Sequence, residues 1–156
     1  MYAEDFIKDL ALEPHPEGGF YRETFRSDIC DGTGRACATS ILFLLTSDNP
    51  SNLHKLDAEE IWYYHSGSPL TVHMIDTSGN YTKVQIGPDI RAGQVLQAVI
   101  SAGIWFGSSC DQDNGFALVG CVVAPGFTFE GFELAQRSEL IEEFPKHAAI
   151  ITRLTG

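Results

Sequence analysis

Residues 51–67, SNLHKLDAEEIWYYHSG, place a histidine and a glutamate directly before an aromatic run that ends at a glycine. The side chains of a β-strand alternate between its two faces. If Glu60 points inward, Trp62 and Tyr64 point inward as well, and the largely apolar residues between them point outward. A strand that needs burial on both faces, with a carboxylate on the inner one, predicts a barrel with a lined interior and an outer surface that packs on something else.

The rest of the chain repeats short strands separated by turns that contain glycine. Strands are predicted at residues 20–26, 38–46, 70–76, 81–86, 95–100, 104–108 and 116–123. Such spacing is typical of all-β sandwiches and barrels. Helical spacing of apolar residues is confined to residues 3–12, before the barrel, and to residues 133–143 and 146–154, after it. A chain of 156 residues without an internal repeat or a linker is predicted to form one domain, residues 1–156.

The acidic composition excludes two classes of partner. The chain has 10 Lys and Arg against 21 Asp and Glu, a net charge of −11. Nucleic-acid binding needs basic side chains that neutralise phosphates, so neither nucleic acid nor an anionic membrane is expected as a partner. No segment is long and apolar enough to span a bilayer, and the N-terminus lacks the pattern of a signal peptide. A cytoplasmic location is the natural expectation.

The four cysteines show no paired C-x-x-C spacing, so they do not predict a zinc site. In a cytoplasmic protein they are expected to be reduced thiols. A disulfide between Cys30 and Cys37 is the alternative that the sequence leaves open.

Four stretches of the chain resemble one family of cupin barrels, catalogued as domain of unknown function 985 or cupin type 5. They are LEPHPEGGFYRETFRS, SNLHKLDAEEIWYYHSG, GQVLQAVISAGIWFG and LVGCVVAPGFTFEGFEL. The resemblance implies a double-stranded β-helix, a jelly-roll-like barrel, with short terminal helices, and it implies a homodimer. It implies no reaction. A homodimer is also expected because Ile61, Tyr63 and alternate residues of 38–46 would otherwise expose an apolar outer surface.

The metal-binding pattern of cupins is only partly present. Glu60 and Gly67 have the spacing of the first cupin motif, and His54 lies where the first histidine ligand falls. The second histidine position is Leu56, and the histidine of the second motif is replaced by Phe106. Because stable metal sites need three or four protein ligands, we expect no metal and no cofactor. A weak ion held by His54, Glu60 and water is the alternative.

A more distant resemblance is to the sugar-nucleotide 3,5-epimerases of the same superfamily. The stretch GGFYRETF is similar to an early strand of these enzymes, which implies that Glu23 faces a ligand. The stretch NLHK is similar to the segment that carries their catalytic base, which implies that role for His54. Leu56 and Phe106 depart from the epimerase pattern as well. The resemblance therefore concerns the fold and the pocket, not the reaction.

Three residues are candidates for catalysis. His54 titrates near neutral pH without tuning, and Glu60 beside Trp62 would have a raised pKa through desolvation. The candidate catalytic residues are His54, Glu60 and Tyr64. A hydrogen-bonded core histidine is the structural alternative for His54.

The candidate ligand contacts combine aromatic rings with a few polar groups, as small-molecule pockets do. They are Arg22, Glu23, Trp62, Gln97, Trp105 and Phe106. Arg22 suits a carboxylate or phosphate, but a salt bridge at the strand edge explains it equally well. Each aromatic ring alone is explained by ordinary core packing. Six residues are expected to converge on one cavity in the barrel: His54, Glu60, Trp62, Tyr64, Gln97 and Phe106.

Three functions fit these observations. The first is a metal-independent isomerase, epimerase or lyase that acts on a small polar or sugar-like compound. The second is a non-catalytic module that binds a small metabolite in the same pocket. The third is a metalloenzyme that retains a weak ion at His54 and Glu60.

Overall fold

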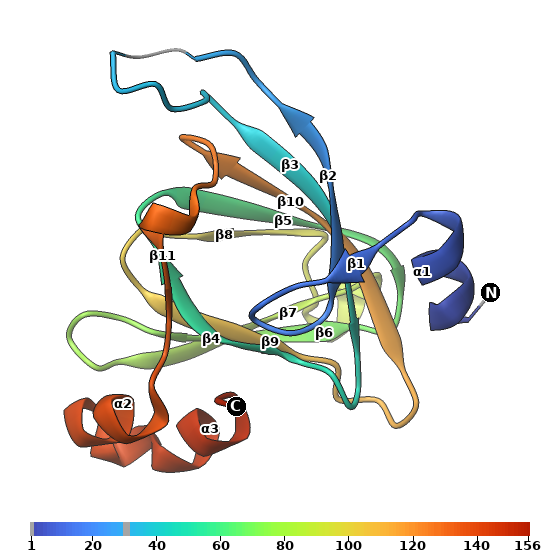
Figure 1. Ribbon diagram of the computed structural model, residues 1–156. Coiled ribbons are helices and arrows are strands. Elements are labelled where there is room, and N and C mark those ends of the chain that lie inside the picture. Colours follow the sequence, from blue (N-terminus) through green and yellow to red (C-terminus); the bar gives the residue numbers. More distant parts are fainter. Residues whose placement is uncertain (1, 30–31) are drawn as a thin grey trace.

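The computed structural model describes residues 2–29 and 32–156, which form two antiparallel β-sheets facing each other (Figure 1). The six-stranded sheet has the order β1 (Glu13–Pro14), β2 (Phe20–Arg26), β3 (Thr39–Thr46), β10 (Phe116–Ala124), β5 (Glu59–Gly67) and β8 (Gln97–Ile100). The five-stranded sheet has the order β11 (Phe132–Leu134), β4 (Ser51–Leu56), β9 (Trp105–Ser109), β6 (Leu70–Ile75) and β7 (Tyr81–Ile86). The predicted double-stranded β-helix is confirmed.

The α-helices lie outside the barrel, near the two ends of the chain (Figure 1). They are α1 (Ala3–Asp9), α2 (Arg137–Glu143) and α3 (Ala148–Arg153). Three 3₁₀ turns accompany them: η1 (Ile90–Ala92), η2 (Phe129–Gly131) and η3 (Pro145–His147). The apolar residues of α1 pack on the outer face of the six-stranded sheet, and those of α2 and α3 pack on the outer face of the five-stranded sheet. The predicted terminal helices are thus confirmed, except that the helix predicted from residue 133 begins at Arg137, after the strand β11.

The alternation predicted for β5 is confirmed. Glu60 and Trp62 are buried, and Tyr64 packs against the same core between the sheets. Ile61 and Tyr63, on the other face, are half-buried. The Trp62 ring meets the ring of Phe43 edge-on, with the ring centroids 5.7 Å apart. Large side chains of both sheets therefore fill the middle of the barrel.

A β-bulge in β2 changes which of its side chains face the interior. At Thr24, β2 contains one residue more than the part of β3 with which it pairs. Beyond this bulge Arg26 lies opposite Thr39, which faces the interior, whereas Phe25 is 57% exposed. Strict alternation along the strand predicted at residues 20–26 would place Phe25 on the face of Glu23 and Arg26 on the other face. That prediction is wrong beyond Thr24, because the extra residue of a bulge shifts the alternation by one.

The expectation that the cysteines are reduced holds for two of them and is wrong for a third. Cys110 and Cys121 are buried and free. Cys37 is disulfide-bonded, so the expectation of a reduced thiol is wrong for this residue. The partner considered in the sequence, Cys30, lies outside the described residues. Within residues 2–29 and 32–156, no helix combines the length and the apolar character needed to cross a membrane.

Candidate functional site

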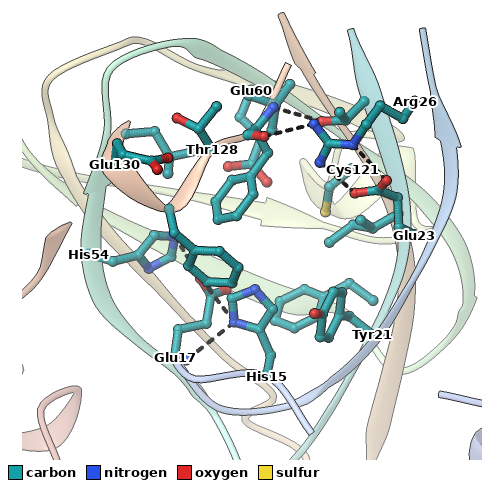
Figure 2. Close-up of a pocket in the computed structure, with 17 residues that line it drawn as sticks. His15, Glu17, Tyr21, Glu23, Arg26, His54, Glu60, Cys121, Thr128 and Glu130 are labelled. Carbon is teal, nitrogen blue, oxygen red and sulfur yellow. Dashed lines mark hydrogen bonds and ion pairs between the residues drawn. The ribbon is translucent and has the colours of Figure 1, made fainter. Parts of the chain in front are cut away.

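A cavity of about 280 Å³ opens into the barrel at the end where β5 begins (Figure 2). Strands β2, β3, β4, β5 and β10, the turn before β2 and the segment around η2 supply its walls. The residues that line it are His15, Glu17, Tyr21, Glu23, Arg26, Thr39, Ile41, Phe43, His54, Leu56, Glu60, Cys121, Val123, Phe127, Thr128, Phe129 and Glu130. Carboxyl groups, two imidazoles and aromatic rings therefore share one enclosed space.

Glu17 and His54 form a buried hydrogen-bonded pair in one wall. His54 Nδ1 lies 2.7 Å from the carbonyl oxygen of Asn52, so this nitrogen carries a proton and donates it. His54 Nε2 lies 3.1 Å from Glu17 Oε2, and Ser51 Oγ donates to Glu17 Oε1 at 2.9 Å. Desolvation raises the pKa of Glu17 well above its ordinary value and lowers the pKa of His54 to about 3. The resting pair is therefore neutral, with the Glu17 carboxylic acid donating to His54.

His15 lies beside this pair. Its Nδ1 accepts the backbone N–H of Glu17 at 3.2 Å, so the proton of the neutral ring is on Nε2. Burial lowers the pKa of His15 to about 4. The ring packs edge-on against Tyr21, with the centroids 4.6 Å apart, and against Phe43 at 5.9 Å. His15 thus contacts both the Glu17 backbone and the aromatic side chains of the cavity wall.

Glu60 enters the cavity from β5, across from Glu17 (Figure 2). It is only 6% exposed, and no basic side chain of the described residues lies within ion-pairing distance. Desolvation raises the pKa of Glu60 to about 8, against the smaller opposite influence of Trp62 and Cys121. The indole nitrogen of Trp62 forms no hydrogen bond of normal geometry with any described residue, so its influence is weak. Glu60 is therefore a neutral acid at pH 7.

The two buried carboxyl groups also influence one another. Charge on Glu60 adds to the effect of burial in raising the pKa of Glu17. Burial raises the pKa of the Cys121 thiol, and both carboxyl groups raise it further. Two carboxylates that share a buried site cannot both ionise easily. The cavity thus retains at least one carboxylic acid over a wide range of pH.

Contacts between β2 and the segment that precedes η2 border the open side of the cavity. Arg26 donates two hydrogen bonds to the Glu23 carboxylate, at 2.9 and 2.8 Å, and one to the carbonyl of Phe127, at 3.1 Å. The backbone N–H of Phe127 donates to the Thr39 hydroxyl at 2.9 Å. These contacts tie the segment that carries Phe127 and Phe129, which line the cavity, to β2 and β3; the Arg26–Glu23 contact is drawn in Figure 2.

Three of the predicted site residues line this cavity: His54, Glu60 and Glu23. Trp62, Tyr64 and Phe106 face the same interior but belong to the packed core next to it. The Tyr64 hydroxyl is bonded to the Gly67 carbonyl at 2.7 Å. The expected convergence of six residues is therefore corrected, because large side chains fill the barrel beyond Glu60 and leave only one end hollow.

The remaining three predicted residues point away from the interior. Gln97 is paired with Tyr63 and shares its outward face, where Gln97 is exposed. Arg22 precedes inward-facing Glu23 and is likewise exposed. Trp105 neighbours inward-facing Phe106, so it lies on the outer face of its sheet. The prediction of Gln97 in the cavity, and of Arg22 and Trp105 as ligand contacts, is corrected because strand alternation places all three on outward faces.

The sequence prediction missed most of the polar and aromatic lining of the cavity, including His15, Glu17, Tyr21, Arg26, Cys121 and Phe127. A signal existed for the first two, since PHPEGG ends in two glycines that let the backbone approach another segment. At Gly19, with φ +72°, an added Cβ would lie 2.9 Å from the Leu44 carbonyl oxygen. No such signal marked Arg26, whose side chain faces the cavity only because the bulge in β2 shifts the alternation.

The donor set does not match the metal centre of cupins. No group of three or more His, Cys, Asp or Glu side chains among residues 2–29 and 32–156 is arranged to hold a metal ion. His54 Nε2 is engaged by Glu17, and the apolar side chain of Leu56 lines the cavity at the position of a cupin histidine. The titratable side chains of the site are therefore its candidate acids and bases.

Comparison with known proteins agrees with the fold. Residues 4–135 match the family described as Cupin superfamily (DUF985). Uncharacterized protein YML079W of Saccharomyces cerevisiae is 32% identical over 146 residues, which cover 81% of this chain and 72% of the yeast protein.

Solved structures extend this likeness to the whole chain. Protein SO0799 from Shewanella oneidensis has a TM-score of 0.96 at 44% identity, over 100% of this chain and 98% of its own. A hypothetical protein from Leishmania major has a TM-score of 0.91 at 38% identity, over 99% of both chains. Oxalate decarboxylase from Bacillus subtilis has a TM-score of 0.60 at 16% identity, over 92% of this chain and 36% of its own, and shares the fold. Together these matches show that the chain belongs to the DUF985 family of the cupin superfamily.

Proposed function

We propose that the protein binds a small polar molecule in the barrel cavity and moves a proton on it, as an isomerase or epimerase does, without a metal. The observation that supports this proposal best is that two sets of titratable groups line the same cavity from opposite walls. One is the Glu17–His54 pair, and the other is the uncompensated carboxyl group of Glu60. Titratable groups whose surroundings shift their pKa values in this way are the usual acids and bases of enzymes.

Glu17 can act as the base through its hydrogen bond to His54. Movement of the Glu17 proton to His54 Nε2, over the 3.1 Å contact, leaves a carboxylate beside the cavity. That carboxylate can take a proton from a carbon next to a ligand carbonyl group. His54 is oriented for this role by Asn52, and Ser51 stabilises the carboxylate by donating to its other oxygen.

Glu60 can act as the acid in the same step. When the ligand C–H bond breaks, its electron pair forms a C=C bond, and the carbonyl oxygen takes the proton of Glu60. The product is a neutral enol, with Glu17 again a carboxylic acid, His54 protonated and Glu60 ionised, so the net charge is unchanged. Return of the proton from Glu17 to the same face of the carbon gives the original compound, and its return to the opposite face, after the enol turns in the cavity, gives the epimer. The hydroxyl proton returns to Glu60, and the His54 proton returns to Glu17. No redox partner is needed.

The test is hydrogen–deuterium exchange into candidate ligands. The protein is incubated in D₂O with a panel of small hydroxyaldehydes and hydroxyketones, and proton NMR follows the carbon next to each carbonyl group. We expect exchange with at least one compound, and a loss of about 10²–10⁴-fold in Glu17→Gln, which retains the shape but cannot accept the proton. Glu13→Gln, an exposed change at the start of the same segment, is the matched control.

The alternative is a non-catalytic binding module. A compound that co-purifies with the protein or binds in the cavity, but never exchanges deuterium, would favour that alternative over proton transfer. His54→Ala separates the two further: an acid–base role predicts loss of exchange with the fold intact. A purely structural role predicts a stability loss of about 1–3 kcal/mol and unchanged ligand affinity.

A further inference from the structure

The positively charged side chain in the cavity wall, Arg26, is already paired with a carboxylate of the protein. Arg26 is the only lysine or arginine among the lining residues that the structure describes. Its Nε and Nη2 atoms bind the two oxygens of Glu23, and its Nη1 atom binds the Phe127 carbonyl. This forked geometry is the one in which a guanidinium binds the carboxylate or phosphate of a ligand. Glu23 therefore stands where an anionic ligand group would bind.

Deeper in the cavity, Glu17, His54 and His15 are neutral and hydrogen-bond to one another through side-chain or backbone atoms. The Glu17 acid donates to His54, and His15 accepts from the backbone of Glu17. A ligand carboxylate or phosphate among them would lack a counter-charge and would face the carboxyl group of Glu60. A ligand ammonium would require Glu60 to ionise while buried. Burial of the unpaired anion is costly, and burial of the ammonium with ionised Glu60 requires the desolvation of both ions.

The size and the walls of the cavity limit the ligand further. A volume of about 280 Å³ lies at the lower end of the range of about 300–1,000 Å³ found for ligand pockets, which favours a ligand smaller than a nucleotide. Glu60, Tyr21 and Thr39 offer hydroxyl-type partners on the walls. The rings of Phe127 and Phe129, 5.1 Å apart, offer apolar surfaces at the entrance. A molecule that presents several hydroxyl groups and one apolar face suits this lining.

We infer that the cavity takes an uncharged compound of monosaccharide size, and that Glu23 determines this specificity by neutralising Arg26. The inference rests on the proposed function, whose substrate class it names. It separates this chain from the sugar-nucleotide epimerases that its sequence resembles, because their substrates carry phosphates. Glu23 is a specificity-determining residue in this scheme and takes no part in proton transfer.

Isothermal titration calorimetry tests the charge class directly. The probes are D-glucose, D-mannose, D-galactose and D-fructose, the 6-phosphate of each, and D-glucosamine as the cationic member. We expect at least one neutral hexose to bind at least tenfold more tightly than its phosphate and than glucosamine. In Glu23→Gln, the affinity for the phosphate should rise at least tenfold, because the guanidinium of Arg26 then lacks its carboxylate. Glu59→Gln changes the net charge equally on an exposed position and should leave the preference unchanged.

Three results would overturn the inference: no binding by any neutral hexose, tighter binding of a phosphate or of glucosamine by the unmodified protein, or equal shifts in Glu23→Gln and Glu59→Gln. Glu23 is partly exposed, so its replacement is expected to fold, and a thermal melt checks this. The outcome is separable from the proposed function. A hexose that binds but exchanges no deuterium contradicts proton transfer and still supports the charge class.

Discussion

At the scale of single residues, the burial of Glu60 has a measurable effect on stability. The folded chain holds the Glu60 proton up to a pKa of about 8, whereas the unfolded chain releases it near 4.5. Between these values the folded state binds more protons than the unfolded state, so stability falls as pH rises. At about 1.4 kcal/mol per pKa unit, the effect across this window is on the order of a few kcal/mol.

Glu60→Gln removes this titration while retaining the shape of the side chain. We therefore expect the stability difference, variant minus unmodified protein, to become more favourable to the variant as pH rises from 5 to 8. Thermal or urea unfolding at both pH values measures it. Exposed Glu59→Gln should show no such trend. A difference that does not change with pH would mean that Glu60 is already ionised in the folded protein.

At the scale of elements, the outer layers of the barrel explain where Trp105 belongs. Trp105 packs with Ile151 of α3 and Leu140 of α2, and the ammonium group of Lys55 lies 4.5 Å from its ring centre. The helices after the barrel therefore cover the face of β9 that points away from the cavity. Trp105 is a contact between helix and sheet, not a contact with a ligand.

Ile151→Ala tests that packing. Ile151 is fully buried, so its truncation leaves a cavity and should lower the free energy of unfolding by about 2–5 kcal/mol. Ile90→Ala, at an exposed isoleucine of η1, should change it by less than about 0.5 kcal/mol. Urea denaturation of both variants makes the comparison. Equal, small losses would mean that α3 contributes little to stability.

At the scale of the whole molecule, the outer face of the six-stranded sheet is incompletely covered. Ile61 and Tyr63 are half-buried there, and Val99, paired with Ile61, is 63% exposed. Monomeric proteins rarely expose a large contiguous apolar patch, and two-fold pairing is the commonest way to cover one. We therefore propose a homodimer formed through this face.

Sedimentation equilibrium should give about twice the chain mass of 17.1 kDa. Val99→Lys places a charge in the proposed interface and should shift the protein toward monomer, whereas Ile90→Lys, on exposed η1, should not. A monomeric unmodified protein at micromolar concentration would contradict the proposal. So would a dimer that both lysine variants leave equally intact.

The sequence by itself determined the barrel, the terminal helices and the inward face of β5. These follow from local periodicity: alternation along residues 59–67 fixes which side of the strand is buried, whatever the partner strands are. It also identified His54 and Glu60, through the spacing of the first cupin motif, and Glu23, through the resemblance of GGFYRETF to an epimerase strand; all three line the cavity.

Only the tertiary structure decided which inward side chains meet a cavity and which meet one another. Trp62 and Glu60 share a face, yet one is packed in the core and the other lines a cavity, because the opposite sheet fills one end of the barrel and not the other. Arg26 enters the site through a bulge, whose extra residue is a property of strand pairing. Glu17 meets His54 across 37 positions of sequence, a contact that depends on the closure of the whole barrel.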